Sequence, residues 1–190
     1  MKVRRRFGRP SRGLPAAVLA LALSPSWAAP PPGTGLDAAM LETFTAMVNG
    51  VRARARDCGR AGVFGPAAPV SYDERLAGAS LAHLTDMIER NYFAHAGGPS
   101  ARYPGGSTLV ERVRASGYPW GVGAMGRGSA VEEVLGRGQR SFGEVLAGWL
   151  ASPSHCAALM SPSMREFGVA VRLRADAVPM WAMLLGRPPR

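Results

Sequence analysis

The chain has 190 residues, of which 47% are hydrophobic and 19% are charged, and its formal net charge is +10. Six basic residues and no acid fall within the first 28 positions, so the rest of the chain holds 17 basic and 13 acidic residues, a net charge of +4. That part has no clustered basic stripe with interleaved aromatic residues, so we expect no nucleic-acid partner. Its length of about 160 residues suits one domain with a sizeable core.

The first 28 residues have the order of a signal peptide. A basic stretch precedes an apolar run from Leu14 to Leu23, and Ser26-Trp27-Ala28 gives a small-x-small cleavage pattern. The apolar run is shorter than the ~20 residues of a membrane-spanning helix, so we expect a secreted or periplasmic protein with no membrane anchor after cleavage. Arg4-Arg5-Arg6-Phe7 fits a twin-arginine signal, while the overall order fits a Sec signal, and both export routes stay open.

Residues 29–35 are rich in proline and glycine, which predicts an extended linker before a single folded domain over residues 36–190. Apolar residues at three- and four-residue steps predict a first helix from Leu41 that ends near Cys58, with Arg52 on its solvated face. Ser71-x-x-Glu74 predicts a capping box and a second helix that continues to about Arg90.

Two more capping boxes follow in the sequence. Thr108-x-x-Glu111 predicts a short helix that ends at Gly117, and Ser141-x-x-Glu144 predicts a helix containing Trp149. After Gly168 the apolar period changes to two, which predicts strands over 169–174 and 180–185 with a turn between them. Helices first and a hairpin last predict an α+β fold, with helices packed on an antiparallel sheet.

The sequence contains two cysteines, Cys58 and Cys156. In an exported protein such a pair most simply forms a disulfide, which would stabilise the fold by about 4–5 kcal/mol in the chain-entropy model. Two buried free thiols are the alternative. A reactive dyad of Cys156 with His155 is disfavoured, because sequence neighbours usually project in different directions.

Two segments of the chain resemble the CAP superfamily, which includes cysteine-rich secretory proteins, insect antigen 5 and plant pathogenesis-related proteins. They are Asn91-Tyr92-Phe93-Ala94-His95 and Gly148 to Gly168, which contains Pro153-Ser154-His155 and Met164-Arg165-Glu166-Phe167-Gly168. The resemblance runs from about Leu41 to Gly186. It implies a three-layer α-β-α sandwich, and it implies that the elements flanking the two cysteines come together, as a disulfide requires.

The resemblance also implies a cleft in which two histidines and two acids from four segments meet. Matching motif by motif gives four positions: His95, Glu133, His155 and Glu166. Glu133 stands for the glutamate of the family's Gly-Glu-Asn segment, whose flanking residues differ here. Glu132 competes with it for this role, because a glycine-rich insertion over 121–130 adjoins the segment.

Two kinds of chemistry fit such a set of side chains. Two neutral imidazoles with one or two carboxylates can hold zinc as a cofactor, with a water in the open position and a glutamate as general base. The same groups can form a metal-free network in which each histidine is held by a carboxylate. The spacing of the residues shows no metal motif by itself. We expect His83, the third histidine, to be a satisfied helix residue rather than a ligand.

Two functions from different classes follow. The first is a monomeric binding module whose cleft holds a small apolar or envelope-derived ligand, with any divalent metal assisting. The second is a metal-dependent hydrolase or peptidase, with His95 and His155 as ligands and Glu133 or Glu166 as base. The sequence has no nucleophile motif such as Gly-x-Ser-x-Gly, and the altered Gly-Glu-Asn segment disturbs a site where catalysis needs tightly held geometry. Both observations favour the binding module.

Overall fold

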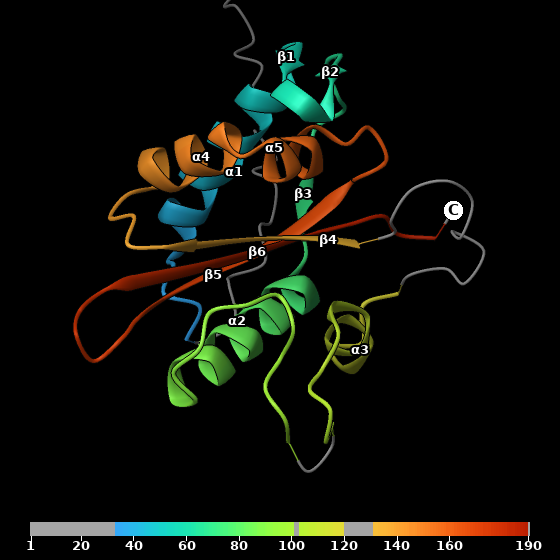
Figure 1. The fold of residues 1–190 in the computed structure, drawn as a ribbon. Coiled ribbons are helices and arrows are strands. Elements are labelled where there is room, and N and C mark those ends of the chain that lie inside the picture. Colours follow the sequence, from blue (N-terminus) through green and yellow to red (C-terminus); the bar gives the residue numbers. More distant parts are fainter. Residues whose placement is uncertain (1–32, 101–102, 120–130, 190) are drawn as a thin grey trace, which may run out of the picture.

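A computed structural model of the chain describes residues 33–100, 103–119 and 131–189. A four-stranded sheet lies between two layers of helices, with α1, α4 and α5 on one face and α2 and α3 on the other (Figure 1). This arrangement confirms the predicted α+β fold and its three-layer α-β-α sandwich. The predicted signal peptide and the insertion over 121–130 lie outside the described residues.

The strand order of the sheet is β3, β5, β6, β4. The strands are β3 (Ser71–Tyr72), β5 (Glu166–Leu173), β6 (Pro179–Gly186) and β4 (Val131–Arg137). β5 and β6 form the predicted hairpin, and β4 adds to β6 as a further antiparallel strand. The short edge strand β3 runs parallel to β5, so the sheet is mixed rather than wholly antiparallel.

The first helical layer consists of α1 (Ala38–Arg52), α4 (Phe142–Ala151) and α5 (Pro153–Met160). Phe44 of α1 is fully buried and meets Phe142 and Trp149 of α4 edge-on, at ring-centroid distances of 5.3 and 6.4 Å. Edge-to-face contacts of this kind add to the stabilisation from burial alone. They fix α1 and α4 together over the sheet.

α1 ends at Arg52, before the predicted end near Cys58, and a short excursion follows it. The excursion consists of β1 (Arg56–Asp57), the 3₁₀ turn η1 (Gly59–Ala61) and β2 (Val63–Phe64). Cys58 precedes η1 and forms a disulfide with Cys156 of α5, with 5.5 Å between the Cα atoms. The predicted disulfide is therefore present, and it ties this excursion to α5.

Arg52 was expected on a solvated face, and that expectation is wrong. Its side chain is fully buried, and the guanidinium donates hydrogen bonds to four backbone carbonyls, those of Ala68, Leu159, Ser161 and Met164. Burial lowers the pKa of Arg52 to about 10, with Arg165 adding a smaller repulsion. Since Leu159 lies in the last turn of α5 and Ser161 caps it, Arg52 satisfies carbonyls that the helix leaves unpaired.

The second helical layer consists of α2 (Glu74–Glu89) and α3 (Leu109–Ala115). The predicted capping box at Ser71 is wrong: Ser71 lies in β3, and Asp73 caps α2 by accepting from the backbone N–H groups of Arg75 and Leu76. The box at Thr108 is present in full, with both reciprocal bonds to Glu111. At Ser141 only half of the predicted box forms, because the Glu144 carboxylate accepts from the N–H of Arg140.

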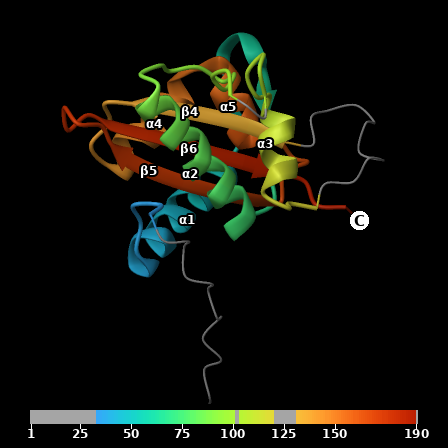
Figure 2. The same ribbon diagram turned by 90° about the horizontal axis from the view of Figure 1, so that it is seen from below.

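α2 lies directly on the sheet (Figure 2). Gly168 of β5 allows this approach, since a Cβ built there would come within 2.0 Å of the backbone nitrogen of Ala77. A substitution of Gly168 would therefore push α2 away from the sheet. No helix within the described ranges is long and apolar enough to cross a membrane.

Candidate functional site

A small cleft of about 280 Å³ lies at the β4 edge of the sheet. Its walls come from β4, α3, α5 and the loop after α2, and the lining residues are His95, Leu109, Glu132, Glu133, Ser154, His155 and Ala158. The structure thus brings His95, Glu133 and His155, three of the four residues matched from the family motifs, to one place.

Glu132 and Glu133 are neighbours on β4, so their side chains leave opposite faces of the strand. Glu133 turns to the side of α2 and α3, where it contacts His83 and Arg112. Glu132 lines the cleft with His155 of α5. Because β4 is an edge strand, both acids border the same cleft. The motif match left open whether Glu132 or Glu133 faces the cleft, and in this structure both do.

Glu133 is the centre of a charged network. Its Oε1 accepts from Nδ1 of His95 at 2.9 Å, and its Oε2 accepts from Nη2 of Arg112 at 2.9 Å. The same Nη2 also donates to the backbone carbonyl of His95 at 2.8 Å. Only 2% of the Glu133 side chain is exposed, against 59% of the His95 side chain. A buried carboxylate is thus held by two cations, one of which faces solvent.

The two cleft histidines differ in their preferred protonation state. The hydrogen bond to Glu133 raises the pKa of His95, with the charge of Glu133 adding to the effect against partial burial. Burial lowers the pKa of His155, and the positive charge of His95 lowers it further. The ring centroids are 6.1 Å apart. The cleft therefore pairs one imidazole that favours its charge with one that favours neutrality.

Glu166 lies outside the cleft. Its Oε2 accepts from the hydroxyl of Tyr118 at 2.6 Å, and the guanidinium of Arg75 lies 5.6 Å from the centroid of the Tyr118 ring. Burial raises the pKa of Tyr118, and the bond to Glu166 raises it further. β6 separates β5 from β4, so Glu166 and Glu133 are roughly 10 Å apart across the sheet. The expected meeting of all four residues in one cleft therefore does not occur in this structure.

Two residues that the sequence did not mark as functional complete the surroundings of Glu133. Arg112 gave no signal, since an arginine near a helix end is most simply interpreted as a solvated charge. His83 was expected to be satisfied, and its Nε2 does lie 2.9 Å from the Ala94 carbonyl. Its Nδ1 has no hydrogen-bond partner among the described residues. Burial lowers the pKa of His83, against the charge of Glu133, which lies 3.9 Å away and acts to raise it.

As arranged, these side chains do not fit a zinc site. In the described ranges no three His, Cys, Asp or Glu side chains are grouped so that they could hold a metal ion. Both oxygens of Glu133 already accept hydrogen bonds, and Glu166 is bonded to Tyr118 elsewhere.

Three solved structures are similar to this fold. An outer surface protein from Borrelia burgdorferi is 16% identical, with a TM-score of 0.56 over 78% of this chain and 89% of that one. An extracellular protein containing an SCP domain from Bacillus anthracis is 19% identical, with a TM-score of 0.56 over 77% of this chain and 39% of that one. A structure described as NaASP2 with Zn²⁺ is 13% identical, with a TM-score of 0.53 over 85% of each chain. At these identities the likeness shows the fold.

A sequence comparison identifies the family. No curated protein matches the chain significantly. The model of the CAP family, described as the cysteine-rich secretory protein family, matches residues 45–177, which is more than half of the chain. The matched range includes both histidines of the cleft, both glutamates of β4 and both cysteines of the disulfide. The chain therefore belongs to the cysteine-rich secretory protein (CAP) family.

Proposed function

We propose that this protein is an exported CAP-domain binding module that holds a small apolar or envelope-derived ligand, with the polar part of that ligand at the cleft beside His95 and His155. Export is supported by the predicted signal peptide. It is also supported by the descriptions of two similar structures, one as an outer surface protein and one as extracellular.

The observation that carries the proposal is the pair of hydrogen bonds accepted by the Glu133 carboxylate. Each of its oxygens accepts a charge-assisted hydrogen bond, one from His95 and one from Arg112. Both carboxylate oxygens are therefore engaged, and only 2% of the side chain is exposed, so Glu133 has little access to a substrate. Satisfied polar networks make rigid walls, as a recognition site requires. The geometry therefore favours binding over catalysis.

The metal-dependent hydrolase is the second candidate, and one feature favours it. His155 is held towards its neutral form, which is the form that zinc needs, and its ring lies near that of His95. Zinc bound by these two rings would supply Lewis-acid chemistry to the cleft. The described residues provide no third ligand beside them. One similar structure is described as NaASP2 with Zn²⁺.

Two measurements on one preparation separate the candidates. The exported protein would be purified without chelator, alongside the His95→Ala, His155→Ala double variant. We expect no zinc in either protein, and we expect organic extraction of the wild type to yield a co-purified or titratable apolar compound. Stoichiometric zinc in the wild type that is lost in the double variant would instead favour the metal-dependent hydrolase.

A further inference from the structure

A second and larger concavity, which we term the α2–α3 groove, has a volume of about 640 Å³. The two helices lie on the same face of the sheet, away from α1, α4 and α5 (Figure 2). The groove is lined by Gly78, Ala79, Ala82 and His83 of α2 and by Arg112 and Ala115 of α3. It shares Arg112 with the network around Glu133, but none of its lining residues lines the cleft.

Small residues make the groove on the α2 side. No described atom lies within 4 Å of a Cβ built at Gly78, so the position opens onto empty space. A glycine inside a helix is less favourable than alanine, and packing among the described residues gives no reason for glycine here.

Two buried nitrogen atoms of lining residues lack hydrogen-bond partners among the described residues, Nδ1 of His83 and Nε of Arg112. His83 is 1% exposed and Arg112 is 8% exposed, each value being for the whole residue. Leaving such an atom unpaired costs free energy, so a ligand that forms a hydrogen bond with it gains affinity.

The two nitrogens have complementary hydrogen-bonding roles. Nε2 of His83 faces the Ala94 carbonyl and must donate to it, so Nδ1 of the neutral ring is left as an acceptor. Nε of Arg112 always carries a hydrogen and can only donate. Both side chains approach the same Glu133 carboxylate, His83 through Nε2 at 3.9 Å and Arg112 through Nη2 at 2.9 Å. A single hydroxyl group, which accepts and donates at one atom, meets both needs.

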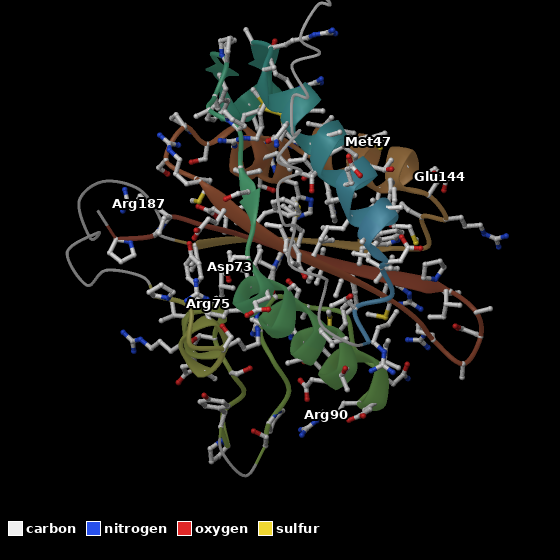
Figure 3. All side chains as sticks on the ribbon, turned by 180° about the vertical axis from the view of Figure 1, so that it is seen from behind. Met47, Asp73, Arg75, Arg90, Glu144 and Arg187 are labelled. Carbon is white, nitrogen blue, oxygen red and sulfur yellow. A yellow bond between two sulfur atoms is a disulfide. The ribbon has the colours of Figure 1, made fainter. Side chains whose placement is uncertain are left out.

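The charges of the groove favour a neutral ligand. Three charged lining residues already have ion-pair partners: Arg75 with Asp73 at 2.5 Å, Asp86 with Arg90 at 2.7 Å, and Arg112 with Glu133 at 2.9 Å. Figure 3 shows Asp73 and Arg75 close together at one end of α2 and Arg90 at its other end. An anionic or cationic ligand would have to compete with these pairs.

We propose that the α2–α3 groove binds a neutral molecule with a hydrocarbon body and one hydroxyl group. The hydroxyl accepts a hydrogen bond from Nε of Arg112 and donates one to Nδ1 of His83. The hydrocarbon body lies along Gly78, Ala82 and Ala115. This inference rests on the proposed binding function, and it names the place and the ligand class.

The test is a titration of the isotope-labelled protein, followed by amide NMR shifts, with three probes: 1-octanol, its isomer heptyl methyl ether, and octanoate. The ether can accept a hydrogen bond but cannot donate one to His83. One hydrogen bond is worth about tenfold in affinity. We expect 1-octanol to bind about tenfold more tightly than either other probe, with shifts in α2 and α3.

Gly78→Leu fills the groove while improving helix propensity, so lost binding cannot reflect lost folding. Gly50→Leu is the matched control, since Gly50 also lies in a helix with no described atom within 4 Å of a built Cβ. Gly78→Leu should weaken 1-octanol at least about tenfold and Gly50→Leu should not. Octanol binding that survives Gly78→Leu but is lost in the His95, His155 double variant would overturn the groove and leave the binding function standing. Equal affinity for octanoate, or no binding of any probe, would also overturn the inference.

Discussion

The cleft at the β4 edge and the α2–α3 groove have no lining residue in common, and they differ in how completely their polar groups are hydrogen-bonded. In the cleft, the Glu133 carboxylate is fully engaged by His95 and Arg112, and the exposed His95 favours its charged form. In the groove, Nδ1 of His83 and Nε of Arg112 are buried and have no hydrogen-bond partner among the described residues, and the wall on the α2 side is made of small residues. A fully hydrogen-bonded network holds its side chains rigidly, whereas unpaired polar atoms in a groove can gain hydrogen bonds from a ligand. A ligand would therefore form more new hydrogen bonds with the protein in the groove than at the residues matched from the family motifs.

The largest expected effect comes from removal of the disulfide, which should disturb the cleft but not the groove. The Cys58→Ser, Cys156→Ser double variant should lose about 4–5 kcal/mol of unfolding free energy in the chain-entropy model, measured by urea denaturation. Cys156 is the neighbour of His155 on α5, so amide shifts should change around the cleft and not around α2 and α3. A loss below about 1 kcal/mol would contradict the structural role assigned to this bond.

Arg112→Met should cost about 3–5 kcal/mol, because it leaves the buried Glu133 carboxylate without its buried cation. Arg114→Met, an exposed position on the same helix, is the matched control and should change stability by no more than about 0.5 kcal/mol. Thermal or urea unfolding of both variants checks the difference. Equal effects would mean that the network around Glu133 does not hold α3 to β4.

Elements of the fold that neighbouring residues determine could be predicted from the sequence, and elements that long-range contacts determine could not. The β5–β6 hairpin and the Thr108 capping box could be predicted, because strand alternation and helix capping depend on residues that are close together in the sequence. β4 could not, because it is buried on both faces and shows no alternation between buried and exposed positions. Asp73 displaced the expected cap at Ser71 because both residue types cap helices equally well.

Of the four residues that the family motifs placed in one cleft, His95, Glu133 and His155 line a common cleft in this structure and Glu166 does not. Its position depends on which strand lies between β4 and β5, and that order is set by long-range pairing rather than by local sequence. Arg52 was expected on a solvated face, and no role was predicted for Arg112. Charge alone gives no sign of burial when the partners are a distant carboxylate or backbone carbonyls.

Gly78→Ala should raise the unfolding free energy by about 0.5–1 kcal/mol, since the added methyl group meets open space and reduces the entropy of the unfolded chain. Calorimetric melting of this variant beside the wild type checks the gain. A destabilised variant would show that the groove is closed at this point, and the contrast with the cleft would fail.

The two cleft histidines should give opposite, small pH dependences. The folded pKa of His95 is raised, so its stabilisation is fully present below the unfolded value of about 6.5 and is lost as the pH rises through the folded value. His155 has a lowered pKa, so its contribution is present above about 6.5 and is lost as the pH falls through the folded value. His95→Gln should therefore be more damaging at about pH 5.5 than at about pH 9, and His155→Gln the reverse. Because these side chains are partly exposed, each difference should stay below about 1 kcal/mol. The same sign for both variants would contradict the account of the network.

The most direct test of the central claim, that the cleft is a hydrogen-bonded network rather than a metal centre, is the melting temperature of the wild type at pH 8 with and without chelator. At this pH both imidazoles of a zinc site would be free to bind, so a bound metal would stabilise the folded state strongly. We expect the two melting temperatures to be equal. A melting temperature that falls with chelator and recovers when zinc is added back would contradict the claim and favour the hydrolase.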